Sequence, residues 1–385
     1  MAIGEQREPE MVTRRGLVVG NYCHDVLFRD GRVVGESLGG AASFVSNVFD
    51  GLSIPCNYVS KVGSDFAYSV SHPPITSPSS MTTLFHAHFF SDRDSSRHQD
   101  RILRRIHACD PISPSDLPES QFDFGLAVGV AGEILPETLE RMLDICRVVF
   151  VDIQALIRVF DPLDGTVKLV ELKDSGFFHL LPRIGFLKAS AEEAPYIDIE
   201  EARKWCAVVV TEGKDGCRVY WKDGELQIFP FPASQIDPTG AGDSFLGGFV
   251  VGFIWGLPVP DAALLGNFFG SLTVGQIGLP KFDSRLLQRV NNELQRKIHC
   301  MGCCRTRDTA ADFRMSVEHK EFQAALVEAT KLLTTYNGQE DEWNSQNSPT
   351  KEIEQIVHQQ NGDPQKLFPD PIYDETVQHV KAAKT

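Results

Sequence analysis

The segment IDPTGAGDSFLGGFVVGF at residues 236–253 constrains this chain more than any other. Three small residues, Gly240, Ala241 and Gly242, lead directly into Asp243, and a glycine-punctuated apolar run follows. Its apolar residues recur at helical spacing, which predicts a buried helix whose first turn carries the acid. The fold must therefore place this helix N-terminus where other groups can approach it closely.

A helix N-terminus presents unpaired N–H groups and a partial positive charge. Because residues 240–242 have no large side chains, a phosphate group could come close to these amides. A carboxylate beside them could take the proton of an attacking hydroxyl, as phosphoryl transfer to an alcohol requires. The alternative is that Asp243 only caps the helix, since Asp and Gly are both common at helix starts.

Strand-like apolar runs alternate with helix-like segments up to about residue 231. This alternation predicts an α/β fold, with a mostly parallel central sheet covered by helices on both faces. Residues 26–34 instead predict a hairpin that turns at Asp30-Gly31 and forms a small β lid. After about residue 285 the sequence becomes polar, although apolar residues between 322 and 333 keep helical spacing.

The composition narrows the classes of function. With 385 residues, of which 42% are hydrophobic, the chain can bury a substantial core, and its net charge of −15 argues against nucleic acid as a partner. The N-terminus lacks an apolar signal segment, and the longest apolar run is too short to cross a membrane. A cytoplasmic protein with reduced thiols is expected. The cluster HCMGCC at 299–304 resembles half of a zinc site but is too crowded for all four ligands to bind one ion easily, so no role is expected; a structural metal and thiol redox chemistry or lipidation are the alternatives.

Residues 237–249 resemble the C-terminal motif of the ribokinase-like (PfkB) carbohydrate kinases, which is close to D-T-x-G-A-G-D-x-F. Other segments agree with that family in order and spacing: VVGNYCHD (18–25), LGGAASFVSN (38–47), VVFVDIQALIR (148–158), KASAEE (188–193), VVVTEGKDG (208–216) and GNFFGSLTVGQIG (266–278). The resemblance implies a ribokinase-like kinase domain over residues 12–285, with lid elements near 26–35 and 82–107. A polar, partly helical or disordered extension would follow over residues 286–385.

The resemblance also implies roles for individual residues, with ATP and Mg²⁺ as cofactors. Asp243 would be the catalytic base, and Glu193 would help to hold Mg²⁺ indirectly. The polyol would be bound by Asp25, Gly39, Gly40 and Asn47. The nucleotide would be bound by Thr211, Gly213, Gly216, Gly240, Ala241, Gly242 and Asn267. The chain departs from the family pattern at Gln154 and Ser190, where Asn is usual, and at Ser43 or Phe44, where a substrate-side Asn is usual.

Segments 38–47 and 186–194 resemble the branch of the family that phosphorylates myo-inositol, in inositol phosphate and phytate synthesis. The prediction is therefore an ATP-dependent kinase that phosphorylates a hydroxyl of a cyclic polyol, with myo-inositol as the leading substrate. Two alternatives stay open: a hexose or pentose kinase, and a non-catalytic scaffold of the same fold. The retained Asp243 and Glu193 argue against the scaffold. The C-terminal extension is a candidate docking segment for a protein partner, and no membrane partner is expected.

Overall fold

A computed structural model describes residues 14–89, 101–301 and 313–331. All of them belong to one compact unit, residues 1–332. Residues 303 and 304 of the cysteine cluster, and the side chain of Cys300, lie outside this description. No helix in the described ranges has the length and apolar character needed to cross a membrane.

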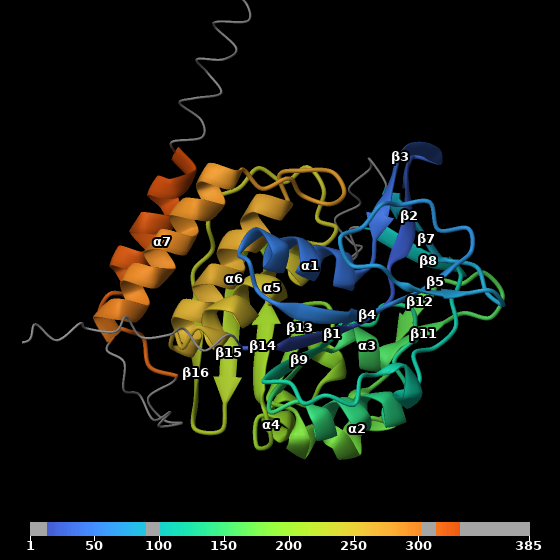
Figure 1. Cartoon of the computed structure of the whole chain (residues 1–385), viewed down its shortest axis with the longest axis horizontal. Helices are drawn as coiled ribbons and strands as arrows, with labels where there is room; N and C mark the ends of the chain where they lie inside the picture. The colour runs from blue at the N-terminus through green and yellow to red at the C-terminus, as the bar shows by residue number, and fades with distance from the viewer. Residues whose placement is uncertain (1–13, 90–100, 302–312, 332–385) are drawn as a thin grey trace, which may run out of the picture. The chain divides into compact units, whose positions relative to one another are not determined.

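The main sheet has eight strands in the order β16-β15-β14-β13-β10-β9-β1-β4 (Figure 1). The six strands from β14 to β4 run parallel, and β15 and β16 are antiparallel additions at one edge. The strands of this sheet are β1 (Gly16–Val19), β4 (Cys56–Val59), β9 (Phe124–Ala127), β10 (Val149–Asp152), β13 (Phe186–Ser190), β14 (Ala207–Thr211), β15 (Cys217–Trp221) and β16 (Gly224–Ile228). Every residue of β1, β9 and β10 is buried, as expected for parallel strands covered on both faces.

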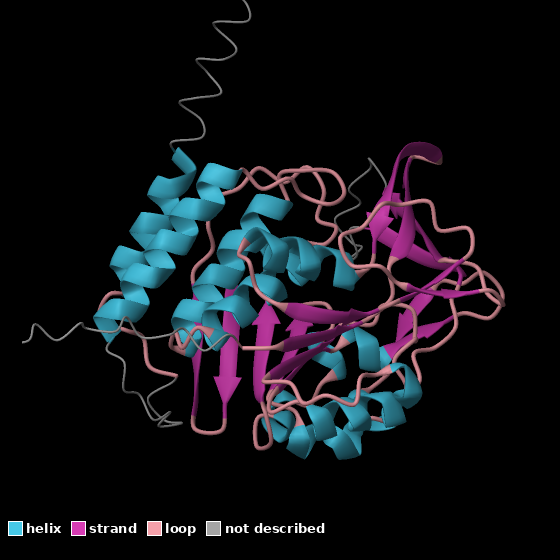
Figure 2. Cartoon of the chain, viewed as in Figure 1, coloured by secondary structure: helices cyan, strands magenta, loops and turns pink. Residues whose placement is uncertain are grey.

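Helices cover both faces of this sheet (Figure 2). Figure 1 shows α1, α5 and α6 over one face and α2 and α4 over the other. The helices are α1 (Ala41–Gly51), α2 (Pro136–Ile145), α3 (Gln154–Ile157), α4 (Ile199–Ala202), α5 (Ala241–Ile254), α6 (Val259–Thr273) and α7 (Ser284–Met301), and residues 319–331 are also helical. The predicted α/β class, with a mostly parallel sheet between helices, is confirmed.

The glycines within α5 bring its neighbouring helices unusually close. A Cβ at Gly248 would lie 2.8 Å from the carbonyl oxygen of Leu265 on α6, and one at Gly247 would lie 3.1 Å from Val48 on α1. Side chains at these positions would therefore push the helices apart. This close packing fixes α5, and with it the acid in its first turn, against the core.

A second sheet of four strands, in the order β3-β2-β7-β8, forms the lid. Its strands are β2 (Cys23–Arg29), β3 (Arg32–Gly39), β7 (Thr83–Phe89) and β8 (Arg101–His107). The predicted hairpin is present, because Asp30 and Gly31 take positive φ angles of 50° and 79° between β2 and β3. Two small sheets complete the strands: β5 (Lys61–Gly63) with β6 (Ile75–Ser77), and β11 (Arg158–Phe160) with β12 (Val167–Leu169).

The chain after residue 285 also contributes to the core. Leu286, Val290 and Leu294 of α7 are buried, as are Phe322 and Leu326 further along the chain. The Asp261 carboxylate of α6 is fully buried; Lys297 Nζ lies 3.0 Å from its Oδ2, and His319 Nδ1 contacts its Oδ1. Residues 284–331 are thus joined to α6 by apolar and ionic contacts.

Candidate active site

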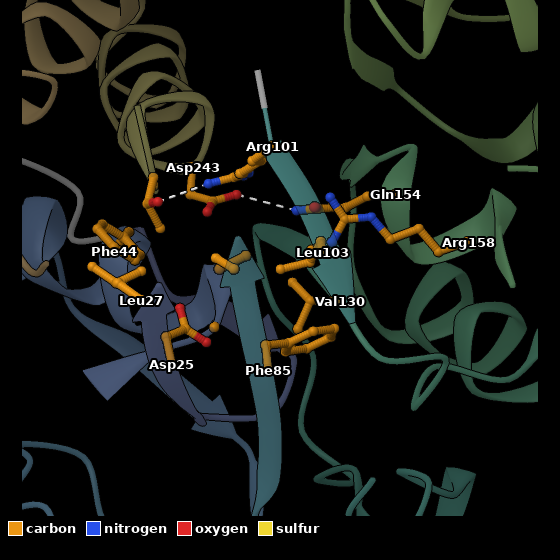
Figure 3. A pocket seen from close by; sticks show the side chains of 15 residues that line it. Asp25, Leu27, Phe44, Phe85, Arg101, Leu103, Val130, Gln154, Arg158 and Asp243 are labelled. Carbon is orange, nitrogen blue, oxygen red and sulfur yellow. Dashed lines mark hydrogen bonds between the residues drawn. The ribbon is translucent and has the colours of Figure 1, made fainter. Parts of the chain in front are cut away.

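A pocket lies between the lid and the N-terminal ends of α1 and α5 (Figure 3). The lid supplies Asp25, Leu27 and Arg101, α1 supplies Phe44, and the first turn of α5 supplies Asp243. Asp25 and Asp243 lie on opposite walls, so one carboxylate faces the other across the space. The pocket therefore combines two acids, an apolar wall and a helix N-terminus.

The backbone turn before Asp243 is one that only glycine fits. Gly240 adopts the left-handed conformation at φ 75°, and a Cβ there would lie 2.0 Å from the ring of Phe44. Ser244 N–H donates to the carbonyl oxygen of Gly240, which starts the helix. Gly240 lines the pocket, whereas the Ala241 N–H donates to the carbonyl oxygen of Pro238 at 3.3 Å. The small residues keep bulky side chains away from this helix start, which is a condition for anion binding there.

Asp243 is held by a side chain from the neighbouring element. Gln154, the first residue of α3, donates a hydrogen bond from Nε2 to Oδ1 of Asp243 at 3.1 Å. Burial raises the pKa of Asp243, and the charges of Lys188 and Arg158 and the Gln154 hydrogen bond act in the opposite direction. The carboxylate is therefore oriented and is a stronger base than an exposed aspartate.

A buried group of charges lies behind Asp243. Lys188 Nζ is 2.9 Å from Oδ2 of Asp152, with both side chains almost fully buried. Burial raises the pKa of Asp152 to about 6 despite this pairing. Glu193 is buried as well, but the positive charges of Lys188 and Arg158 overcome the effect of burial and lower its pKa. Carboxylates of this kind are ligands that suit Mg²⁺.

Asp25 sits on β2 directly opposite the lid strand that ends at Gly39. A Cβ at Gly39 would lie within 2.5 Å of the Asp25 carboxylate, so this glycine makes room for the acid. Burial raises the pKa of Asp25 to about 7; Arg101 lowers it and Asp243 raises it further. Gly40 follows as the residue before α1 and lines the pocket.

Comparisons with known proteins agree with this geometry. The pfkB family carbohydrate kinase pattern matches residues 184–282. An inositol 3-kinase of Arabidopsis thaliana is 64% identical over 284 residues, which make up 74% of this chain and 80% of the relative. An inositol 3-kinase of Oryza sativa subsp. japonica is 55% identical, over 83% of this chain and 82% of the relative.

The chain belongs to the pfkB family of carbohydrate kinases. Solved structures agree on the fold: a pyrophosphate-dependent kinase of the ribokinase family, in complex with sulfate, superposes with a TM-score of 0.60 at 19% identity. That likeness covers 69% of this chain and 97% of the other. The family resemblance inferred from the motifs is confirmed.

The predicted nucleotide side of this pfkB kinase lies at the carboxyl ends of the parallel strands. Thr211 ends β14, beside Ser190 at the end of β13, and its hydroxyl donates to the carbonyl oxygen of Ala189. Gly213 and Gly216 take φ angles of 57° and 90° in the turn that follows. Asn267 is buried on α6 and donates through Nδ2 to the carbonyl oxygens of Ile228 and Phe229. It thereby joins α6 to the end of β16.

Of the predicted site residues, Asp25, Gly40, Gly240 and Asp243 line the pocket and the others do not. Asn47 donates from Nδ2 to the carbonyl oxygen of Pro280, 2.6 Å away, and so connects α1 with the segment after α6. Glu193 accepts the N–H of Ser190 at 2.8 Å and lies 4.0 Å from Arg158. Ser190, which replaces the usual Asn, still contributes its backbone to holding the acid.

The sequence of this kinase did not predict that three positively charged residues lie near the pocket. Arg101 of the lid donates to the hydroxyl of Thr239 at 2.7 Å, Arg158 lines the pocket, and Lys188 lies behind Asp243. Lys188 and Arg158 stand within motifs that were recognised, at KASAEE and VVFVDIQALIR. Their positions next to predicted site residues in these motifs could have indicated that they lie near the pocket. Arg101 lies in none of these motifs and follows a long polar stretch, so the sequence does not indicate that it lies near the pocket.

Proposed function

We propose that this chain transfers the γ-phosphoryl group of ATP to a hydroxyl of myo-inositol. The observation that carries the proposal is the place of Asp243, at the open N-terminus of α5 and across the pocket from Asp25. One carboxylate is thus available for the attacking hydroxyl and another for the remaining hydroxyls. The high identity to inositol 3-kinases supports the choice of acceptor and favours the 3-hydroxyl.

The reaction follows from the residues around the pocket. Asp25 accepts hydrogen bonds from the polyol, and the backbone of Gly39 and Gly40 shapes that end of the site. Asp243 takes the proton of the attacking hydroxyl as its oxygen forms a bond to phosphorus. The amides at residues 240–242 stabilise the charge on the transferring group. Gln154 keeps Oδ1 of Asp243 in place throughout.

Thr211, Gly213, Gly216 and Asn267 would form the nucleotide side, at the carboxyl ends of the parallel strands, where open α/β sheets bind ligands. Mg²⁺, when bound to the phosphates, neutralises part of their charge. Glu193 fits an indirect role in holding it, because its low pKa keeps it ionised and oxygen is the ligand that Mg²⁺ prefers. Asn47 would affect polyol binding indirectly, by holding α1 in position beside the pocket.

The apolar part of the pocket supports the preference for one hydroxyl. In a ribokinase-family kinase with the same fold (TM-score 0.57, 18% identity), two substitutions to leucine convert a pyrophosphate-dependent myo-inositol-1 kinase into a myo-inositol-3 kinase. Leu27 and Leu103 of the present lid line the pocket. Apolar side chains on this wall would restrict the orientations in which the ring presents a hydroxyl to Asp243.

The test is to incubate the purified chain with Mg-ATP or Mg-pyrophosphate and a panel of myo-inositol, ribose and fructose. Release of ADP would be followed, and the product isomer would be assigned by phosphorus NMR and chiral chromatography. Myo-inositol 3-phosphate formed from ATP is the expected product. Preference for ribose or fructose would replace the proposed acceptor, and absence of transfer to any acceptor would favour the scaffold alternative.

A further inference from the structure

Arg158 is a largely buried arginine whose side chain reaches the pocket. It is the first residue of β11, directly after α3, and its side chain is 15% exposed. Pairing of β11 with β12 places Arg158 opposite Leu169 and fixes its backbone. Figure 3 shows the guanidinium extending past Gln154 towards the space beneath Asp243.

The guanidinium has few partners of its own. In residues 14–89, 101–301 and 313–331, its nearest carboxylate is Glu193, with Nη2 4.0 Å from Oε1, and none of its N–H groups makes a hydrogen bond. Arginine has five N–H donors, and no Arg158 nitrogen is among the fully buried, unpaired side-chain atoms of the described residues. The donors are therefore open to the pocket that Arg158 lines, where a bound anionic group can accept them.

The other two cations near the pocket are already engaged. Lys188 is paired with Asp152 at 2.9 Å, and Arg101 donates to the hydroxyl of Thr239 at 2.7 Å. Arg158 lies close enough to both Asp25 and Asp243 to lower the pKa of each. Arg101 has the larger effect on Asp25 and Lys188 the larger effect on Asp243, so Arg158 is the one of these three cations that acts on both carboxylates.

We propose that Arg158 is a catalytic residue that binds the phosphoryl group as it reaches the acceptor oxygen and then holds the phosphate of the product. In the transfer, the bond from the γ-phosphorus to the bridging oxygen of ADP breaks and the bond to the polyol oxygen forms. The hydroxyl proton goes to Asp243. Arg158 donates two N–H groups to the phosphoryl oxygens and exchanges no proton, a geometry that guanidinium suits better than ammonium.

This inference rests on the proposed function, so its test begins with the unaltered enzyme. Calorimetric titration, with neither nucleotide nor metal present, would measure the affinity for myo-inositol and for myo-inositol 3-phosphate. Arg158→Gln is expected to weaken binding of the monophosphate at least about tenfold, the loss expected for charge-assisted hydrogen bonds, and to change binding of myo-inositol less than about threefold. The kcat should fall about 10²-fold with little change in the KM for the polyol.

Three further proteins make the result decisive. Arg158→Lys keeps the charge without the paired donors, so it should fold and still bind the monophosphate more weakly than the unaltered enzyme. Arg147→Gln removes an arginine that is 84% exposed and should change neither affinity. In Arg158→Gln/Glu193→Gln, monophosphate affinity should stay low; its recovery would show that Arg158 only offsets the charge of Glu193.

Equal monophosphate affinities in the unaltered enzyme, Arg158→Gln and Arg158→Lys would overturn the inference. If the unaltered enzyme neither binds nor phosphorylates myo-inositol, the proposed function fails instead. The two failures are therefore distinguished by the unaltered protein alone.

Discussion

Gln154 Nε2 donates a hydrogen bond to Oδ1 of Asp243 over 3.1 Å, and this contact joins α3 to the first turn of α5. It stabilises the ionised form of Asp243, because an amide donor interacts best with a carboxylate. The contact thus orients the proposed catalytic base and acts, with the charges of Lys188 and Arg158, against the rise in its pKa that burial causes.

Replacing Asp243 by Asn should leave the fold intact and lower turnover at least about 10²-fold, because general-base assistance is lost. The amide retains an oxygen that can accept the Gln154 hydrogen bond. Steady-state assays of ADP release, together with thermal unfolding, would check this. Turnover close to that of the unaltered enzyme would remove Asp243 from the mechanism.

Replacing Gln154 by Leu should raise the pKa of Asp243, since a donor to its ionised form is lost. The acid limb of the profile of kcat/KM against pH should then move to higher pH. Gln154→Glu is not a suitable control because it adds a charge, so Arg147→Gln serves instead. An unshifted acid limb would show that another group controls it.

Asp25→Asn should stabilise the protein at pH 8 while it weakens binding of the polyol. Burial raises the pKa of Asp25 to about 7 in the folded protein, against about 3.9 in an unfolded chain. The folded state therefore binds more protons between about pH 4 and 7, and Asp25 makes stability fall as pH rises through that window.

The Asn variant avoids this loss, so its gain should be about 4 kcal/mol at pH 8 and close to zero at pH 4. Urea unfolding at both pH values would measure it. A gain of the same size at pH 4 would mean that ionisation of Asp25 is not its origin.

Lys297→Met should destabilise the protein by about 3–5 kcal/mol at pH 7, because the buried Asp261 carboxylate loses its nearest ammonium. A chain that stops after residue 290 lacks both Lys297 and His319 and should unfold still more readily. Chemical unfolding of each variant would check this, with Lys331→Met as an exposed control. A truncated chain that is fully stable and active would show that these contacts are dispensable.

The pKa of Asp261 adds a pH dependence to that cluster. Burial acts to raise this pKa, but hydrogen bonds from His319 and Ser316 and the Lys297 charge bring it below the ordinary value. The associated stability is present above the unfolded pKa of about 3.9 and is lost as pH falls through the lower folded value. Below that pH, unaltered protein and Lys297→Met should differ less in their free energy of unfolding than they do at pH 7.

Much of this architecture follows from local pattern. The buried runs of β1, β9 and β10 predicted a covered parallel sheet, and Asp30-Gly31 predicted the lid hairpin, because turn chemistry and periodicity act over a few residues. The glycine turn before Asp243 likewise predicted a helix that begins at an exposed end.

The charged surroundings of Asp243 could not be predicted in the same way. Lys188 meets Asp152 because β10 and β13 pair in a register that makes these two residues partners, and that register is a long-range property. Asn47 bonds to Pro280, 233 residues away, which no local pattern indicates. Arg158 reaches the pocket from the junction of α3 and β11, a placement that depends on how these elements pack in the fold.

The two carboxylates of the pocket belong to different parts of the fold. Asp243 stands on a helix packed so tightly against α1 and α6 that even a methyl group would not fit between them, whereas Asp25 is carried by the β-lid. The distance between Asp25, which would bind the polyol, and Asp243, which would act as the base, thus depends on the position of the lid relative to α5. Substrate binding, phosphoryl transfer and product release should therefore all depend on the same movement of the lid relative to α5. Raising the solvent viscosity should then slow turnover even when every catalytic group is intact.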